Sequence, residues 1–388
     1  MKLKSSSFYI AVLVFSVLFL IVGNRIASGD GFGNDDFIDP LSYYSGVVTN
    51  IIEQSEVEDM WGSTSKQIIF EARITSRERR GDVVIASQEI FDSTWGNTKE
   101  IEVGDRIVVV YDSFNNNYFF ANYVRINYIL ILGAFFLALV LLFGRKKGFN
   151  AIVALGFTCM AVFWIFIPAL LTGKNIYITT IIVCTFSIVS TLLLVIGKNK
   201  KALSAMLGCL GGVLLAGMLM FFMDIVMGLT GLLDSETRSL LFLPTENPIN
   251  LRAIIFAGVI IGAVGAIMDV AMSIASSLWE VREAGGTSDF KGIMKSGINI
   301  GRDILGTMLN TLILAYIGSS LSLILLVSVH ATSMVELFNM ELIIVEFLRA
   351  LVGAFGMLLT IPLTAIICAW LYSKHNPSKR SHIMLNVL

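Results

Sequence analysis

The most distinctive chemical residue in this chain is Asp269, the one ionisable side chain inside the long apolar stretch from Ile254 to Trp279. A carboxylate in hydrocarbon is costly unless it is paired, protonated or hydrated. In a helix of 3.6 residues per turn, Asp269 lies on one stripe with small and polar residues, which are Gly258, Gly262, Gly265, Ser273, Ser276 and Glu280. The pattern predicts that this stripe faces a protein interior, and that the opposite face, from Ile260 to Leu278, meets lipid or apolar helices.

Two later apolar stretches repeat this pattern. Their polar and small residues recur at helical spacing, as Asn299, Asp303, Gly306 and Asn310 in one, and as Glu346, Arg349, Gly353, Gly356, Thr360 and Thr364 in the other. At about 1.5 Å per residue, Asp269 lies roughly 16 Å from the inner boundary and Arg349 roughly 12 Å from the outer one. The spacing predicts three helices around a shared polar interior, with Asp269 and Arg349 in one network.

That network has two interpretations. It is either a static ion pair that sets the helix register, or a site where a proton or cation is exchanged during transport, tuned by Arg349 and Asn310. The predicted interior comprises Asp269, Ser273, Ser276, Asn299, Asp303, Asn310, Glu346 and Arg349. A second set is expected to let helices approach closely, namely Gly258, Gly262, Gly265, Gly306, Gly353 and Gly356.

Other chemistry has little support. Glycine-rich phosphate loops and nucleophile elbows are missing from the sequence, its three histidines are scattered, and its acidic clusters lack EF-hand spacing. We therefore expect no metal, no cofactor, no catalytic residue and no nucleic-acid partner. An intramembrane aspartyl protease using Asp269 and Asp303 is a disfavoured alternative, because Asp303 follows Gly301-Arg302 and lies near the inner boundary.

The composition predicts a polytopic α-helical membrane protein. Of the 388 residues, 55% are hydrophobic and 15% charged, and the mean hydropathy is +0.78. Eight segments are apolar enough to insert: Phe8–Val22, Tyr128–Phe143, Ala151–Leu171, Tyr177–Ile196, Ala202–Met227, Ala253–Trp279, Ile304–Val329 and Leu342–Tyr372. The first is expected to be an uncleaved anchor, because Arg25 and Ile26 make a poor cleavage region, with a signal peptide as the alternative.

Orientation follows from the basic residues of the short loops. Clusters at 145–147, 198–201 and 282–302, with more at both ends of the chain, contrast with only Lys174, Arg238 and Arg252 in the other short loops. The positive-inside rule then places both termini in the cytoplasm and residues 24–127 outside it. All four cysteines fall in membrane segments, so no disulfide framework is expected.

Residues 24–127 form a polar, acidic segment that predicts a small extracytoplasmic β-rich domain. Its β-branched runs, bounded by turn residues, are Tyr43–Glu53, Gln67–Thr75, Asp82–Ile90, Arg106–Asp112 and Tyr118–Ile126. Five short strands suit an OB-like or SH3-like barrel or a sandwich. The expected organisation is therefore an anchor over 1–23, this domain over 24–127, a seven-helix membrane domain over 128–373 and a cytoplasmic tail over 374–388.

Three membrane stretches carry a family resemblance. They read GVIIGAVGAIMDVAMSIASSLWE, SGINIGRDILGTMLNTLILAYIGSSL and FLRALVGAFGMLLTIPLTA, and they resemble the YibE/F family of bacterial membrane proteins over about residues 148–372. The exported segment, with ARITS at 72–76 and EVGDRIVVV at 102–110, is similar to the family's N-terminal part. The resemblance implies a bacterial plasma membrane location and the eight-helix layout. It assigns no catalytic residue.

Two functions compete. The first is a secondary transporter or permease for an unknown small solute or ion, coupled to protons through Asp269. The second is a membrane scaffold or accessory protein whose extracytoplasmic β domain binds a protein partner or an envelope component. A water-accessible cavity at midplane depth would favour transport, whereas Asp269 packed dry against Arg349 would favour the scaffold. The lipid bilayer is the common partner in both.

Overall fold

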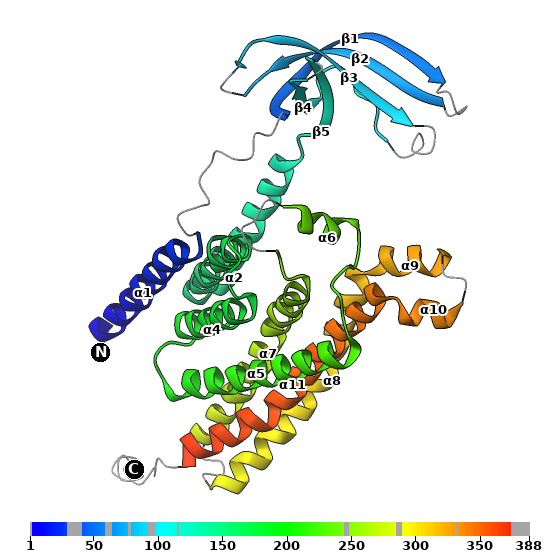
Figure 1. Cartoon of the computed structure of the whole chain (residues 1–388). Helices are drawn as coiled ribbons and strands as arrows, with labels where there is room; N and C mark the ends of the chain where they lie inside the picture. Colours follow the sequence, from blue (N-terminus) through cyan, green and yellow to red (C-terminus); the bar gives the residue numbers. More distant parts are fainter. Residues whose placement is uncertain are drawn as a thin grey trace. The chain divides into compact units, whose positions relative to one another are not determined.

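The computed structural model describes residues 2–28, 41–58, 64–76, 79–91, 98–114, 116–243, 248–284, 289–330 and 333–373. The chain divides into two compact units, one formed by residues 33–143 and the other by residues 1–32 with 144–388 (Figure 1). Among the described residues, the first unit holds one buried apolar cluster and the second holds two.

The first unit contains a closed five-stranded barrel. The strands are β1 (Leu41–Glu58), β2 (Thr64–Ile74), β3 (Val83–Phe91), β4 (Arg106–Asp112) and β5 (Asn117–Tyr123). They close in the order β1-β2-β3-β5-β4, with every pairing antiparallel except the parallel β3–β5 pair. Alternate side chains fill the interior, as Ile107 and Val109 do from β4. The predicted β-barrel is confirmed, and closure selects the barrel over the sandwich.

The second unit is helical. Its helices are α1 (Lys2–Ser28), α2 (Ile126–Ala161, whose first part belongs to the other unit), η3 (Val162–Phe166), α3 (Ile167–Leu171), α4 (Ile176–Val195), α5 (Lys200–Met227), α6 (Ser235–Ser239), η4 (Leu240–Phe242), α7 (Leu251–Glu283), α8 (Phe290–Ser319), α9 (Leu321–His330), α10 (Met334–Asn339) and α11 (Glu341–Ser373). Among the described residues, seven helical runs are long and apolar enough to cross a membrane.

Two of the eight predicted segments share one helical run. The stretches 128–143 and 151–171 lie in the continuous run Ile126–Leu171. Arg145 breaks this run, since its φ of 48° and ψ of −127° are not helical. A single non-helical residue replaces the expected connecting loop, and for this reason the segments merge.

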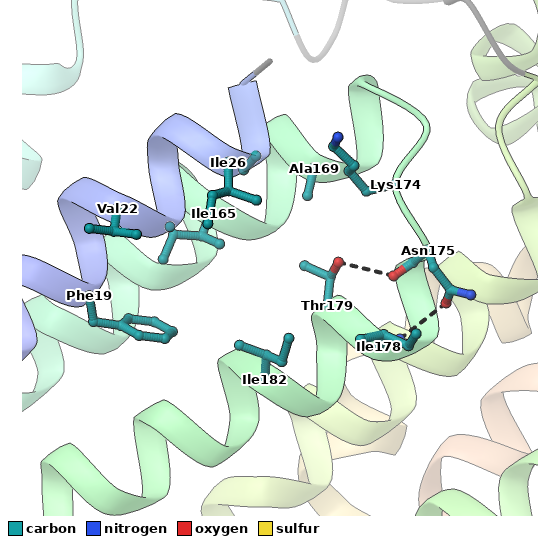
Figure 2. A pocket seen from close by; sticks show the side chains of 12 residues that line it. Phe19, Val22, Ile26, Ile165, Ala169, Lys174, Asn175, Ile178, Thr179 and Ile182 are labelled. Carbon is teal, nitrogen blue, oxygen red and sulfur yellow. Dashed lines mark hydrogen bonds between the residues drawn. The ribbon is translucent and has the colours of Figure 1, made fainter.

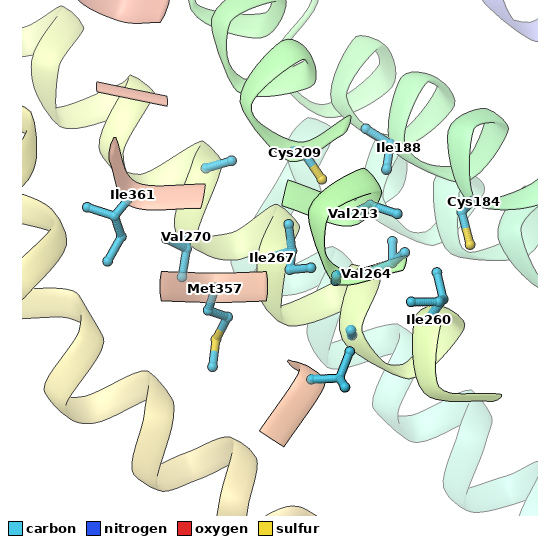
Figure 3. Close-up of a cluster of buried hydrophobic side chains, with 14 of the residues drawn as sticks. Cys184, Ile188, Cys209, Val213, Ile260, Val264, Ile267, Val270, Met357 and Ile361 are labelled. Carbon is cyan, nitrogen blue, oxygen red and sulfur yellow. The ribbon is translucent and has the colours of Figure 1, made fainter. Parts of the chain in front are cut away.

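The core of the helical unit lies between α5, α7 and α11. Large aliphatic side chains of α7, such as Ile267 and Ile274, are fully buried there, as Figure 3 shows for Ile267, Val270 and Met357. Glycines of α5 allow close contact, because a Cβ at Gly212 would overlap Thr360 Oγ1. The sides of α7 and α8 that face away from this core take no part in these contacts.

Candidate functional site

The stripe around Asp269 faces away from the core of the helical unit. Gly258, Gly262, Gly265 and Asp269 are all exposed, whereas the opposite face of α7 is buried, with Ile260 at 2% and Ile267 at 0% exposure. The prediction that the stripe faces a protein interior is therefore not met among the described residues, whereas the aliphatic face packs against apolar helices, one of the two surroundings predicted for it. The aliphatic face of α7 is buried because its branched side chains pack closely against α5 and α11, whereas the glycines of the stripe have no side chain with which to make such contacts.

The polar row of α8 also points away from the core. Asn299, Asp303, Gly306 and Asn310 are exposed. The other side of α8 packs closely through Gly297 and Gly301, where an added Cβ would lie 2.8 Å from Ala365 Cβ and would overlap Ile361 Cγ2, respectively. The row is thus a surface of the helical unit, and the predicted convergence of three polar stripes on one interior is not observed.

The two exposed rows occupy matching lengths of neighbouring helices. At one end, a Cβ at Gly297 would lie 3.0 Å from Leu278 Cδ1, and at the other, a Cβ at Gly262 would lie 3.0 Å from the Tyr316 hydroxyl. These contacts make α7 and α8 antiparallel neighbours. Asp269 lies between them along α7, as Asp303 and Asn310 do along α8. We call this surface the α7–α8 polar face, made up of Gly258, Gly262, Gly265, Asp269, Asn299, Asp303, Gly306 and Asn310.

The carboxylates and amides of this face have no partner within the described part of the chain. Ion pairs and hydrogen bonds reach none of the side chains of Asp269, Asn299, Asp303 and Asn310 there. The neighbouring Thr307 instead donates its hydroxyl to the carbonyl of Ile304, at 3.0 Å. Ser273 and Ser276 are half-buried beside the row. Polar groups in an apolar region thus lack the partners that normally accompany them.

Arg349 has a different partner from the one predicted. Its Nη1 lies 2.7 Å from Oε1 of Glu346, three residues earlier on α11, and both side chains are largely buried. Ser320, which ends α8, donates its hydroxyl to Oε2 of the same carboxylate. The expected Asp269–Arg349 network is therefore wrong. Glu346 is within reach on the same helix face, and Asp269 points away from the core in which α11 lies.

Some of the glycines predicted to let helices approach lie at close helix contacts, and others do not. Gly353 and Gly356 are buried, and a Cβ at Gly356 would lie 2.6 Å from Ile267 Cδ1, so α11 approaches α7 closely at Gly356. Added Cβ atoms at Gly258, Gly265 and Gly306 would meet nothing within 4 Å. These three therefore have no packing purpose within the described residues.

Sequence analysis missed several tightly packed residues. Gly208 and Gly212 on α5 approach the two buried threonines of α11. The four-residue spacing of this pair, and of Gly297 and Gly301, is the helix-packing pattern that could have identified them. Another is Asp224, which is 6% exposed and whose buried Oδ1 has no hydrogen-bond partner among the residues that the structure describes. A lone aspartate at a helix end carried no signal for this burial.

The comparisons with known proteins identify the family. The sequence profile of the YibE/F-like protein family matches residues 132–374, well over half of the chain. The chain belongs to this YibE/F-like family. No curated protein and no solved structure matches it. The matched region of this YibE/F-like protein contains both rows of the α7–α8 polar face.

The donor set of the YibE/F-like chain offers no cluster for a metal ion. Within the described ranges, no group of three or more histidine, cysteine, aspartate or glutamate side chains comes together. Asp269 and Asp303 belong instead to a spread-out row with amides, serines and glycines. Such a row can bind cations weakly, relay protons or line a path for polar solutes.

Proposed function

We propose that this protein is a membrane permease subunit in which the α7–α8 polar face lines the path of an ion or small polar solute. The observation that carries the proposal is the exposure of Asp269 and Asp303 on apolar, membrane-length helices. Lipid tails cannot solvate a carboxylate or an amide, so such groups face water or another polypeptide. A second copy of this chain closes the face and encloses water against it.

The glycines of the face support this arrangement. Gly258, Gly265 and Gly306 leave open surface where any larger residue would project. Small residues let another helix approach closely, or leave room for a hydrated ion. Asp269 follows Gly265 by about one turn on the same row, and it is the ionisable side chain of the α7 row that exchanges a proton or cation.

Flux measurements test the proposal. Full-length protein in liposomes should conduct protons under an imposed potential, and Asp269→Asn should lower the flux at least tenfold, since an amide exchanges no proton. Glu236→Gln, in the exposed helix α6, is the matched control and should leave the flux unchanged. A folded Asp269→Asn protein with full flux would contradict the role of Asp269.

Labelling tests hydration separately. In a background without the four native cysteines, Gly265→Cys should react with a polar, membrane-impermeant maleimide. Leu358→Cys, on α11 and also exposed, should react far more slowly because it faces lipid. Equal rates at both positions would contradict a water-lined face.

A second function, partner binding by the barrel, is supported by one observation. Tyr43, Val110 and Phe119 are paired in register across β1, β4 and β5, and Ile85 lies two residues before Ser87, the β3 partner of Phe119. Tyr43, Ile85 and Phe119 are exposed, so the barrel carries an outward apolar row. A photo-crosslinking residue at Phe119 should give an adduct in cells and one at Asn122 should not. Equal adduct yields would contradict this alternative.

A further inference from the structure

An apolar cavity of about 340 Å³ lies in the helical unit, away from the polar face. Figure 2 shows its walls, with Phe19, Val22 and Ile26 from α1 on one side and Ile178 and Ile182 from α4 on the other. Ile165 of η3 lies between them. The volume falls at the lower end of the range of about 300–1,000 Å³ that is typical of ligand pockets.

The cavity arises where the backbone departs from a regular helix. Residues 162–166 form a π-helical turn, and the next helix, α3, has Pro168, which lacks a backbone N–H, at its second position. Helix α1 touches this turn at Gly23, where a Cβ would lie 2.5 Å from Ile165 Cδ1. The hydroxyl of Thr172 donates to the carbonyl of Ala27 at 2.7 Å and holds the end of α1. The cavity beside these contacts is therefore built into the fold.

The cavity has one polar end. Lys174 and Asn175 line it and also line an adjoining pocket of about 210 Å³, which extends over Tyr177 and Asn250. The ammonium group of Lys174 has no carboxylate within 4.0 Å in the described ranges. Asn175 and Asn250 cap the first turns of α4 and α7, so two positive helix ends flank the same pocket.

We propose that these joined cavities bind an anionic phospholipid of the surrounding bilayer. One acyl chain occupies the apolar cavity, and the headgroup phosphate lies against Lys174 and the adjoining polar pocket. The apolar walls supply nothing for a soluble anion, and a neutral headgroup would leave the ammonium group uncompensated. An amphiphile with a negative headgroup satisfies both ends.

Lipid competition tests the headgroup contact. Full-length protein is delipidated in detergent, mixed with phosphatidylglycerol or phosphatidylcholine of identical chains, and examined by native mass spectrometry. We expect about a fivefold preference for phosphatidylglycerol, the effect of one lysine at an anionic headgroup. Lys174→Gln should remove this preference and Lys174→Arg should keep it. Lys147→Gln, an exposed lysine remote in sequence, should also keep it.

A second pair of variants tests the acyl-chain contact. Ile182→Trp fills the cavity and should lower the retention of either lipid. Ile181→Trp, at the adjacent exposed position outside the cavity lining, should not. The proposal is overturned if Lys174→Gln keeps the preference, if Lys147→Gln loses as much of it, if both tryptophan variants behave alike, or if soluble glycerophosphate displaces the lipid.

Discussion

At the residue scale, Asp269 and its neighbouring glycines lie on the outer side of α7 because other side chains pack better inside. Val270, Ala271 and Ile274 are buried, and each makes many small dispersion contacts with other helices. Turning α7 around would exchange these contacts for glycine hydrogens and a charge. The surface position of Asp269 therefore follows from the packing of its opposite face.

Gly212 and Gly265 make a matched pair for testing this packing. Gly212→Ala should lower the free energy of unfolding by about 1–3 kcal/mol, because the new Cβ would overlap Thr360 Oγ1. Gly265→Ala should be neutral or slightly stabilising, since its Cβ meets nothing within 4 Å and alanine favours helix. Thermal unfolding in detergent measures both. Equal losses would mean that α5 and α11 are less tightly packed than described.

At the element scale, local sequence accounts for most strands and helices. The turn before β4 is an example, because Gly104 has a φ of +96°, which glycine adopts readily. Asp105 then accepts the backbone N–H of Glu102 at 3.0 Å and pairs with Lys99 at 2.7 Å. Short-range groups thus set the start of the strand, and for this reason its beginning at Arg106 was predictable from the sequence.

Asp105 should make the barrel sensitive to acid. Partial burial raises the pKa of its carboxyl group, but hydrogen bonds from Lys99 and Glu102 outweigh this and keep the pKa below its ordinary value. Because the pKa of Asp105 is lower in the folded barrel than in the unfolded chain, its ionised carboxylate stabilises the barrel fully at pH values above the unfolded pKa of about 3.9. This stabilisation is lost as the pH falls through the folded pKa.

Hydrogen exchange of β1 and β4 in the full chain, corrected for intrinsic rates, measures this. Asp105→Asn should weaken the protection of these backbone amides at neutral pH, and their protection should decrease less as the pH is lowered. Asp82→Asn, at an exposed position of the β2–β3 turn, should behave as wild type. An unchanged acid response in Asp105→Asn would assign the sensitivity to other groups.

At the scale of the whole molecule, the barrel and the helical unit have separate cores. Phe70 is fully buried in the barrel core, so Phe70→Ala should destabilise the barrel by about 3–5 kcal/mol. Hydrogen exchange in the full-length protein should then show weaker protection in the strands and none of this loss in α5, α7 or α11. Coupled loss in both units would contradict their independence.

The apolar segments, the strands of the barrel, the polar rows and the family could all be predicted from the amino-acid sequence, because each depends on composition or on spacing within a short stretch. The sequence could not determine which face of α7 is buried or which carboxylate pairs with Arg349. Those depend on how side chains from distant helices fit together, as Ile267 does against Gly356. Only the tertiary structure decided that the residues around Asp269 form a surface, since helix faces compete for the same neighbours and the better-packed face occupies the interior.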